Sequence, residues 1–444
     1  MSKFVLDMTK GREISHLLKF SIPLLIGNIF QQVYSVVNSI VVGKQVGDTA
    51  FAAIGIVGNL SFLLFSICMG LATGIGIVVS HYFGANRKDE VQRTIGNSIY
   101  LLGGVGIVMG ILGIIFAESI LTFMKTPTEV MAYALPYMKV LSAGTVFVAG
   151  YNGIAAILRS LGDAKTPLIF LAISNIINMI LDIILVVYLD MGILGAAWAT
   201  VFSQGFSVIG SIFFAMRVNP YLQLKKEQFA LRKNIFMQSI RIGLPVGLQN
   251  AFVASSMVAL QSVVNGFGTE VMAAFTATGR IEQIISQPYN ALGTAVATFT
   301  GQNLGSNNIK RIQSGYKKSV YMIMAYSLVA IFIVFCASEW IVKNFISDPD
   351  TVLLASKATR LTCVFYMQLG YIYVVKGVLN GVGDGVFALL HGIIEVVSRL
   401  LFPIMLLQIL NVGVWGIWLT MGFTWSVTAI MGVLRYKQGK WKKV

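Results

Sequence analysis

The sequence predicts an all-α polytopic membrane protein of twelve transmembrane helices, in two six-helix bundles related by a parallel internal repeat. Three observations support this fold class. Of the 444 residues, 56% are hydrophobic and only 11% are charged, whereas a soluble globular domain carries roughly 25% charged residues. Apolar stretches recur along the whole chain, and short motifs recur at about half its length.

The apolar stretches have the length of membrane spans. Each comes near or exceeds the ~20 residues that a helix needs to cross the hydrocarbon layer. Because lipid offers no partner to a backbone N–H or C=O group, each stretch is expected to be helical. The predicted spans are 15–42, 51–81, 94–117, 131–157, 166–189, 193–216, 239–266, 272–302, 318–342, 355–380, 386–410 and 413–434.

The two halves of the chain match at an offset of about 221 residues. Gly162-Asp163 pairs with Gly383-Asp384 at this offset, and the FGAN sequence ending at Asn86 pairs with LGSN. Six spans in each half make the repeat parallel, about an axis along the membrane normal. The predicted domains are an N-terminal lobe at 1–216, a cytoplasmic linker at 217–238, and a C-terminal lobe with a basic tail at 239–444.

The net charge of +15 comes from basic residues between the spans. Most of the 33 Lys and Arg residues fall on one side of the predicted topology, including the start of the chain, the central linker and the tail. Since positive residues stay in the cytoplasm, both termini are predicted to be cytoplasmic, in a bacterial inner membrane. This placement suits contact with a lipid bilayer and argues against a nucleic-acid partner. No obligate protein partner is indicated.

Sequence motifs of the common enzymes are missing from the chain. HExxH, Walker A and nucleophile-elbow patterns do not occur, and the three cysteines form no CxxC pair. We therefore expect no enzymatic activity, no metal site and no cofactor. Two like-oriented bundles that meet at an axis are typical of transporters, which bind substrate in the central cleft.

Several stretches resemble the multidrug and toxic compound extrusion (MATE) family over essentially the whole chain. They are PLLIGNIFQQVYSVVNSIVVGKQVG (23–47), SHYFGAN (80–86), LRSLGDAKTP (158–167), NIINMILDIILV (175–186) and GRIEQIISQPYNALGTAVATFTGQNLGS (279–306). The resemblance implies an antiporter that exports cationic, amphipathic compounds, driven by inward flow of H⁺ or Na⁺. Many bacterial members carry an acid in the first helix, at the position where this chain has Asn38.

The fifth predicted span holds a carboxylate inside the bilayer. Asp182 follows Asn178 by four residues and Asn175 by seven, so that all three share one helix face. Charge inside a span is costly, and such residues usually mark an ion or substrate path. One carboxylate and two amide oxygens could bind Na⁺, and the carboxylate could carry a proton. The resemblance also implies an essential acid here. The alternative is a buried Asp that hydrogen-bonds for helix packing.

The first predicted span carries a polar stripe on an apolar helix. Its residues recur every three to four positions and should face protein or water instead of lipid. The stripe predicts a substrate cavity in the first lobe, with hydrogen bonding between helices as the alternative, and with Asn38 assigned to the ion site. The cavity candidates in this span are Asn28, Gln31, Tyr34 and Ser35.

The second half has its own polar residues inside the spans. Glu395 precedes Arg399 by four residues, which is the favourable order for a helical ion pair. His391, a further four residues earlier, could titrate near neutrality or serve as a hydrogen-bonding residue. Together with Glu282, Gln283 and Gln287 of the eighth span, they complete the predicted substrate cavity.

Two other functions compete with antiport. A flippase for lipids or polysaccharide precursors shares this architecture, and it would need a cationic cavity for phosphate-bearing substrates. Only a few cations, such as Arg280, Lys376 and Arg399, lie inside the predicted spans. A channel or a receptor is the third candidate, and the duplicated six-helix halves argue against it.

Overall fold

The computed structural model describes residues 5–443, with side chains left out at 35–45, 48 and 443. Helices make up its regular structure, and the described residues contain no strand. The α-helices are α1 (Glu13–Val46), α2 (Asp48–Gly84), α3 (Lys88–Phe123), α4 (Thr128–Ala143), α5 (Thr145–Ser160), α6 (Lys165–Asp182), α7 (Gly192–Val218), α8 (Lys233–Asn265), α9 (Thr269–Gly305), α10 (Ile309–Val342), α11 (Pro349–Cys363), α12 (Tyr366–Gly381), α13 (Gly385–Pro403) and α14 (Trp415–Lys437).

These helices confirm the predicted fold class. Among the described residues, eight helices are long and apolar enough to cross a membrane, and two bent helix pairs raise the number to ten. The α1 and α9 helices, with 34 and 37 residues, are also of spanning length. The chain is therefore a twelve-span membrane protein.

Two of the predicted spans are not single helices. The span predicted at 131–157 consists of α4 and α5, which meet at Gly144 with a bend of 47°. The span predicted at 355–380 consists of α11 and α12, with a bend of 51°. Hydropathy runs through both bends without interruption, so the apolar pattern could not reveal them.

The repeat extends to the backbone conformation. Asn86 and Asn307 both have a φ of 57°, and the glycines at 162 and 383 have φ of 86° and 84°. A short π-helix follows α6 at Ile183–Tyr188 (η1), and another follows α13 at Ile404–Ile409 (η3). Turns, bends and π-helices thus recur at the offset of about 221 residues that the sequence motifs gave.

The described chain packs as two compact units. The first comprises the residues up to Met8 together with Ile22–Gly247, and the second comprises Thr9–Ser21 together with Leu248 onward. The long helices α1 and α8 each contribute to both units. The predicted lobe boundaries at 216 and 239 stay a prediction.

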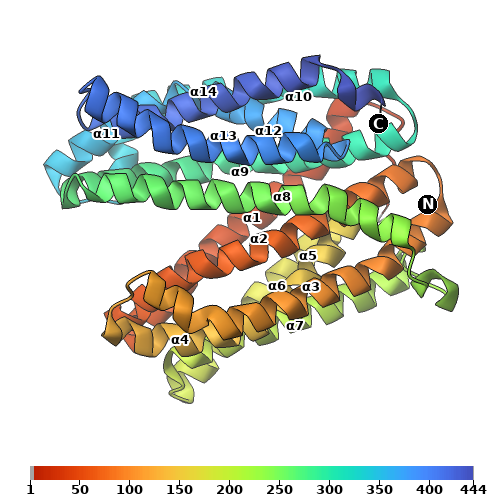
Figure 1. Cartoon of the computed structure of the whole chain (residues 1–444), viewed down its shortest axis with the longest axis horizontal. Coiled ribbons are helices and arrows are strands. Elements are labelled where there is room, and N and C mark those ends of the chain that lie inside the picture. Colours follow the sequence, from red (N-terminus) through yellow and green to blue (C-terminus); the bar gives the residue numbers. More distant parts are fainter. Residues whose placement is uncertain (1–4, 444) are drawn as a thin grey trace. The chain divides into compact units, whose positions relative to one another are not determined.

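In the first unit, α2, α3 and α5 run next to one another around an apolar core (Figure 1). The beginning of α8 packs tightly on α2 through glycines of both helices. A Cβ atom at Gly70 would lie 2.1 Å from the backbone N of Gly247, and one at Gly74 would lie 2.5 Å from Cα of Gly243. Glycines spaced four apart on both helices allow the two backbones to touch.

The linker between the halves is bound to the start of α3. Gln92 Nε2 donates to the carbonyl of Gln223 at 2.9 Å. Asn97 Nδ2 donates to the carbonyl of Ala230 at 3.2 Å, and Asn97 Oδ1 accepts the N–H of Arg232 at 2.8 Å. These bonds satisfy loop backbone groups and fix the entry into α8. A 3₁₀ turn, η2 (Lys226–Phe229), lies within this segment.

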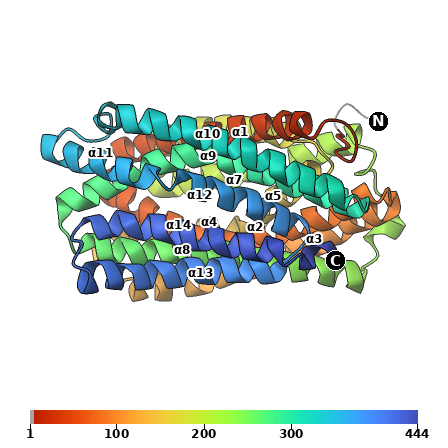
Figure 2. The ribbon, with the colours of Figure 1, turned by 90° about the horizontal axis from the view of Figure 1, so that it is seen from above.

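In the second unit, α9, α10 and α12 run side by side, and α13 packs on α14 (Figure 2). Asp384 caps the first turn of α13 by accepting the N–H of Phe387 at 3.0 Å. The same carboxylate accepts two bonds from Arg435 near the end of α14, at 2.7 and 2.9 Å. A bidentate Arg–carboxylate pair thus joins the two helices. A final 3₁₀ turn, η4 (Lys440–Lys443), ends the described chain.

Candidate ion and substrate sites

Asp182 is the last residue of α6, directly before the π-helix η1. Its side chain is 1% exposed, and neither carboxylate oxygen has a hydrogen-bond partner among the described residues. An ionised carboxylate in such a place is costly unless a cation or a proton balances it. A buried carboxylate that only served helix packing would be hydrogen-bonded, so the geometry favours a group that takes up a cation.

Asn178 lies one helical turn before Asp182 and is 2% exposed. Its Oδ1 accepts a hydrogen bond from the hydroxyl of Tyr34 in α1. Its Nδ2 faces two hydroxyls of α7, 3.4 Å from Thr200 Oγ1 and 3.2 Å from Ser203 Oγ. The structure thus joins the predicted polar face of α6 to the polar stripe of α1.

The α7 hydroxyls were not predicted to belong to this group. Thr200 and Ser203 lie three residues apart in an otherwise apolar span, which is a weak signal because Ser and Thr commonly bond to their own helix. Both do so here, since Thr200 donates to Ala196 and Ser203 donates to the carbonyl of Thr200. Their oxygen lone pairs nevertheless face the amide of Asn178.

The remaining first-unit candidates differ in how they are placed. Nδ2 of Asn175 is buried without a hydrogen-bond partner among the described residues. Asn28 is half-buried and Gln31 is exposed. The side chains of Ser35 and Asn38 lie outside the described residues, so their predicted roles stay predictions.

The π-helix after Asp182 has a counterpart that lacks the carboxylate. In the second repeat the residue before η3 is Pro403, which occupies the position of Asp182. Single π-turns inside helices occur frequently at functional sites. Here the backbone feature belongs to both halves, and the acid belongs only to the first.

In the second unit, Glu395 and Arg399 form the predicted ion pair on α13. Glu395 Oε2 lies 2.6 Å from Arg399 Nη1, and both residues are 4% exposed. Arg399 Nη1 also donates to the hydroxyl of Ser256 in α8 at 2.5 Å. The pairing lowers the cost of keeping both charges away from water.

His391 lies on the same face of α13 and is also 4% exposed. Neither ring nitrogen has a hydrogen-bond partner among the described residues, and the ring packs edge-on against Phe387. The predicted hydrogen-bonding role is therefore not seen in this structure.

The remaining second-unit candidates lie on α9. Glu282 Oε1 is buried without a hydrogen-bond partner among the described residues. Gln283 is exposed, and its carbonyl accepts a bond from Gln287 Nε2 at 2.9 Å. The second unit thus holds two acids inside its spans, and one of them, Glu395, is paired with an arginine.

A duplicated six-helix unit of apolar spans, with buried acids inside each half, defines a polytopic membrane transporter. The MatE family model matches residues 23–184 and again residues 245–405, so one copy falls in each half. The chain belongs to this family of multidrug efflux transporters, and it is not an enzyme. The family membership that the sequence motifs indicated is confirmed.

Relatives and solved structures agree with this assignment. The probable multidrug resistance protein YpnP of Bacillus subtilis is 30% identical over 98% of this chain and 97% of its own length. The probable multidrug resistance protein NorM of Thermotoga maritima is 21% identical over 96% and 93%. A solved structure of a multidrug resistance MATE family transporter in an outward-facing conformation covers 100% of both chains, with 23% identity and a TM-score of 0.91. That likeness concerns the fold.

Proposed function

We propose that this chain is an antiporter that exports small, amphipathic, cationic compounds by alternating access of its two lobes, driven by inward flow of H⁺ or Na⁺. Asp182 is the proposed coupling acid. The observation that carries the proposal is a carboxylate with 1% exposure and no hydrogen-bond partner on either oxygen among the described residues. Such a group gains most from a bound cation or proton.

Both ions fit the chemistry around Asp182. For Na⁺, the carboxylate together with oxygens of Asn178, Asn175 and the α7 hydroxyls supplies hard ligands. For H⁺, protonation removes the buried charge and turns the carboxyl group into a hydrogen-bond donor. Asn38 is included in the proposed ion site on the sequence pattern alone.

Coupling requires that the ion and the drug prefer different arrangements of the lobes. We assign drug binding to the polar stripe of α1 in the first unit and to the acids Glu282 and Glu395 in the second unit, which would attract a cationic substrate. The names of the relatives, multidrug resistance and multidrug export proteins, support a range of small molecules. We further propose a bacterial cytoplasmic membrane with both termini in the cytoplasm, as the basic loops indicate.

Ethidium efflux from proteoliposomes under an imposed H⁺ or Na⁺ gradient tests the proposal. Wild type should export ethidium under one of the two gradients. Asp182→Asn, which keeps the shape and removes the charge, should lose gradient-driven efflux by about tenfold or more. Asp190→Asn is the matched control because Asp190 is exposed and has a φ of 50°, a conformation that Asn tolerates.

The outcomes separate the proposed roles. Equal efflux by wild type and Asp182→Asn would remove Asp182 from coupling and point to Glu282 or Glu395. If wild type exports no ethidium under either gradient but scrambles a fluorescent phospholipid between leaflets, the flippase function replaces antiport.

A further inference from the structure

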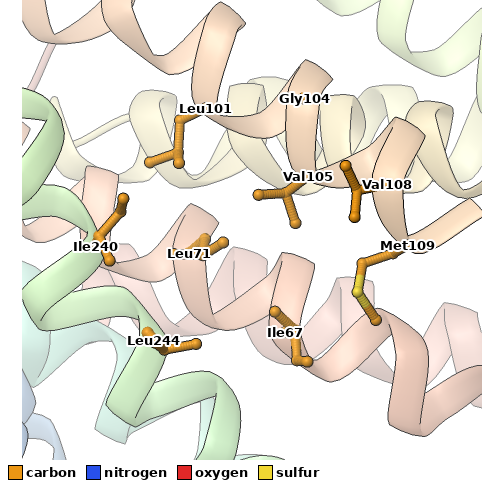
Figure 3. A pocket seen from close by; sticks show the side chains of 9 residues that line it. All are labelled: Ile67, Leu71, Leu101, Gly104, Val105, Val108, Met109, Ile240 and Leu244. Atoms are coloured by element: carbon orange, nitrogen blue, oxygen red, sulfur yellow. The ribbon is translucent and has the colours of Figure 1, made fainter. Parts of the chain in front are cut away.

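A narrow groove lies in the first unit among α2, α3 and the beginning of α8 (Figure 3). Leu101, Val105 and Val108 of α3 point into it from one side. Ile240 and Leu244 of α8 line it opposite α3, and Ile67 and Leu71 of α2 form its floor. All of these side chains are hydrocarbon, and Val108 is 54% exposed. The groove is therefore apolar and open along a membrane-spanning helix.

Two features of the backbone create the groove. The glycine contact between α2 and α8 draws α8 down onto α2, so that the α2 side chains become a floor. At Gly104 the α3 wall has no side chain, and a Cβ atom there would meet no atom within 4 Å. The space amounts to about 290 Å³.

A basic edge adjoins the groove at the α8 side. Arg241 lies three residues before Leu244, a spacing that makes these two side chains neighbours on the helix surface. Its side chain is exposed, and it makes no hydrogen bond or ion pair with the described residues. Helical side chains lean toward the N-terminal end, where exposed Lys233 begins α8 and exposed Arg232 precedes it. A free positive charge thus lies next to an apolar slot.

We propose that the groove binds one acyl chain of an anionic phospholipid, with the lipid phosphate paired to Arg241. An arginine suits this role because its planar fork binds phosphate oxygens in a bidentate manner. The α3 side of the slot, from Leu101 to Met109, is ~12 Å long at ~1.5 Å per residue. That length matches part of an acyl chain whose glycerol end lies at the membrane surface.

The dimensions favour a lipid chain over a transported drug. Pockets for drug-sized ligands usually measure ~300–1,000 Å³ and include polar groups that orient the ligand. This groove is at the lower limit of that range, and its lining carries no polar side chain. A bound chain would fill the space between α3 and α8 and would hold α8 against α2.

The test compares two glycines of α3. Gly104→Leu places a side chain in the groove, whereas Gly103→Leu places one beside it, and a Cβ atom at either position meets nothing within 4 Å. The full-length protein is delipidated in detergent, titrated with phosphatidylglycerol or phosphatidylcholine, and examined by native mass spectrometry. Wild type and Gly103→Leu should retain one phosphatidylglycerol, and Gly104→Leu should bind it about tenfold more weakly.

The headgroup is tested with Arg241→Gln. This variant should still bind lipid but should lose most of the preference of wild type for phosphatidylglycerol over phosphatidylcholine. A phosphatidylglycerol with a photoreactive diazirine in its acyl chain gives an independent measurement, and its crosslinks should map to 101–109 and 240–244.

Three results would overturn the proposal. Equal retention by wild type and Gly104→Leu would show that no chain occupies the groove. Equal binding of both lipids by wild type would show that the groove does not select an anionic lipid. Displacement of the lipid by saturating ethidium, together with weaker ethidium binding by Gly104→Leu, would make the groove a substrate path instead.

Discussion

Asn178 and Arg399 occupy the same position in the two repeats, about 221 residues apart, and they build opposite electrostatic environments. Asn178 joins hydroxyl groups of neighbouring helices next to an unpaired carboxylate. Arg399 forms an ion pair with Glu395 and a hydrogen bond with Ser256. One fold has therefore been duplicated, and its two copies carry different buried charges.

The Glu395–Arg399 pair should be sensitive to the loss of one partner. Arg399→Met leaves the Glu395 carboxylate buried without its cation, which should cost about 3–5 kcal/mol of unfolding free energy. The double variant Glu395→Leu with Arg399→Met should recover most of that loss, because an apolar pair needs no solvation. Unfolding of the purified protein in detergent measures both. A double variant as unstable as the single one would contradict the explanation.

The glycine contact between α2 and α8 should not tolerate a methyl group. Gly70→Ala forces the two backbones apart and should destabilise the protein by about 1–3 kcal/mol, as other overpacked cores do. Gly58→Ala is the matched control on the same helix, since a Cβ atom there meets nothing within 4 Å. It should be neutral or stabilising by up to about 1 kcal/mol. Similar unfolding midpoints for the two variants would show that the contact is dispensable.

The hydroxyl of Tyr34 should orient Asn178 for ion binding. Tyr34→Phe removes the hydrogen-bond donor and leaves the amide group of Asn178 free to rotate. The loss should weaken ion binding by about 1 kcal/mol, which is about a fivefold lower affinity for the ion. The concentration of H⁺ or Na⁺ that half-saturates ethidium efflux measures this change. The maximal rate should change less than the half-saturating concentration, and the reverse pattern would assign Tyr34 to substrate movement.

Glu13, the first residue of α1, should make the stability of the second unit depend on pH. A hydrogen bond from Lys318, whose Nζ lies 2.8 Å from Glu13 Oε2, lowers the pKa of Glu13 to about 2. Because the pKa of Glu13 in the folded protein lies below the usual Glu value of 4.5, this stabilisation is present above about pH 4.5 and is lost as pH falls toward 2.

Unfolding midpoints of wild type and Glu13→Gln between pH 7 and pH 3 check this sign. Wild type should be the more stable protein at pH 7, and the difference should shrink below about pH 4.5. The stability difference between wild type and Lys318→Met should also shrink below about pH 4.5. The effect should be small because the Lys318 side chain is 38% exposed and solvent screens it. A constant difference at all pH values would rule out the ion pair as its cause.

Most of the fold could be predicted from the sequence because lipid imposes a strong constraint on the chain. Apolar length determines the number of spans, and the offset between Gly162 and Gly383 revealed the duplication. The bends at Gly144 and after Cys363 could not be predicted, since a kink inside protein leaves the apolar pattern unchanged. The glycine contact of α2 with α8 was also missed, because it depends on which helices meet.

The candidate site was predicted unevenly for a physical reason. Asp182 and the Glu395–Arg399 pair were recognised because charge inside an apolar span is costly. The hydroxyls of Thr200 and Ser203 carry no such cost and are common in membrane helices, so nothing in the sequence distinguished them. His391 was expected either to titrate or to hydrogen-bond, and only the structure showed that its ring nitrogens have no partner among the described residues.

The hydrogen bonds from Gln92 and Asn97 to the linker affect where the chain could be divided into two co-expressed fragments. A split inside 217–238 would separate α3 from the backbone groups that it binds and would leave both fragments with unpaired polar ends. A split after Gly247 would cut α8 inside a membrane span, where the new chain ends and the unpaired backbone groups would lie in hydrocarbon without water. Both breaks should therefore impair the reassembly of co-expressed halves, and the carboxyl-terminal tail, not the linker, is the place for a fluorescent reporter.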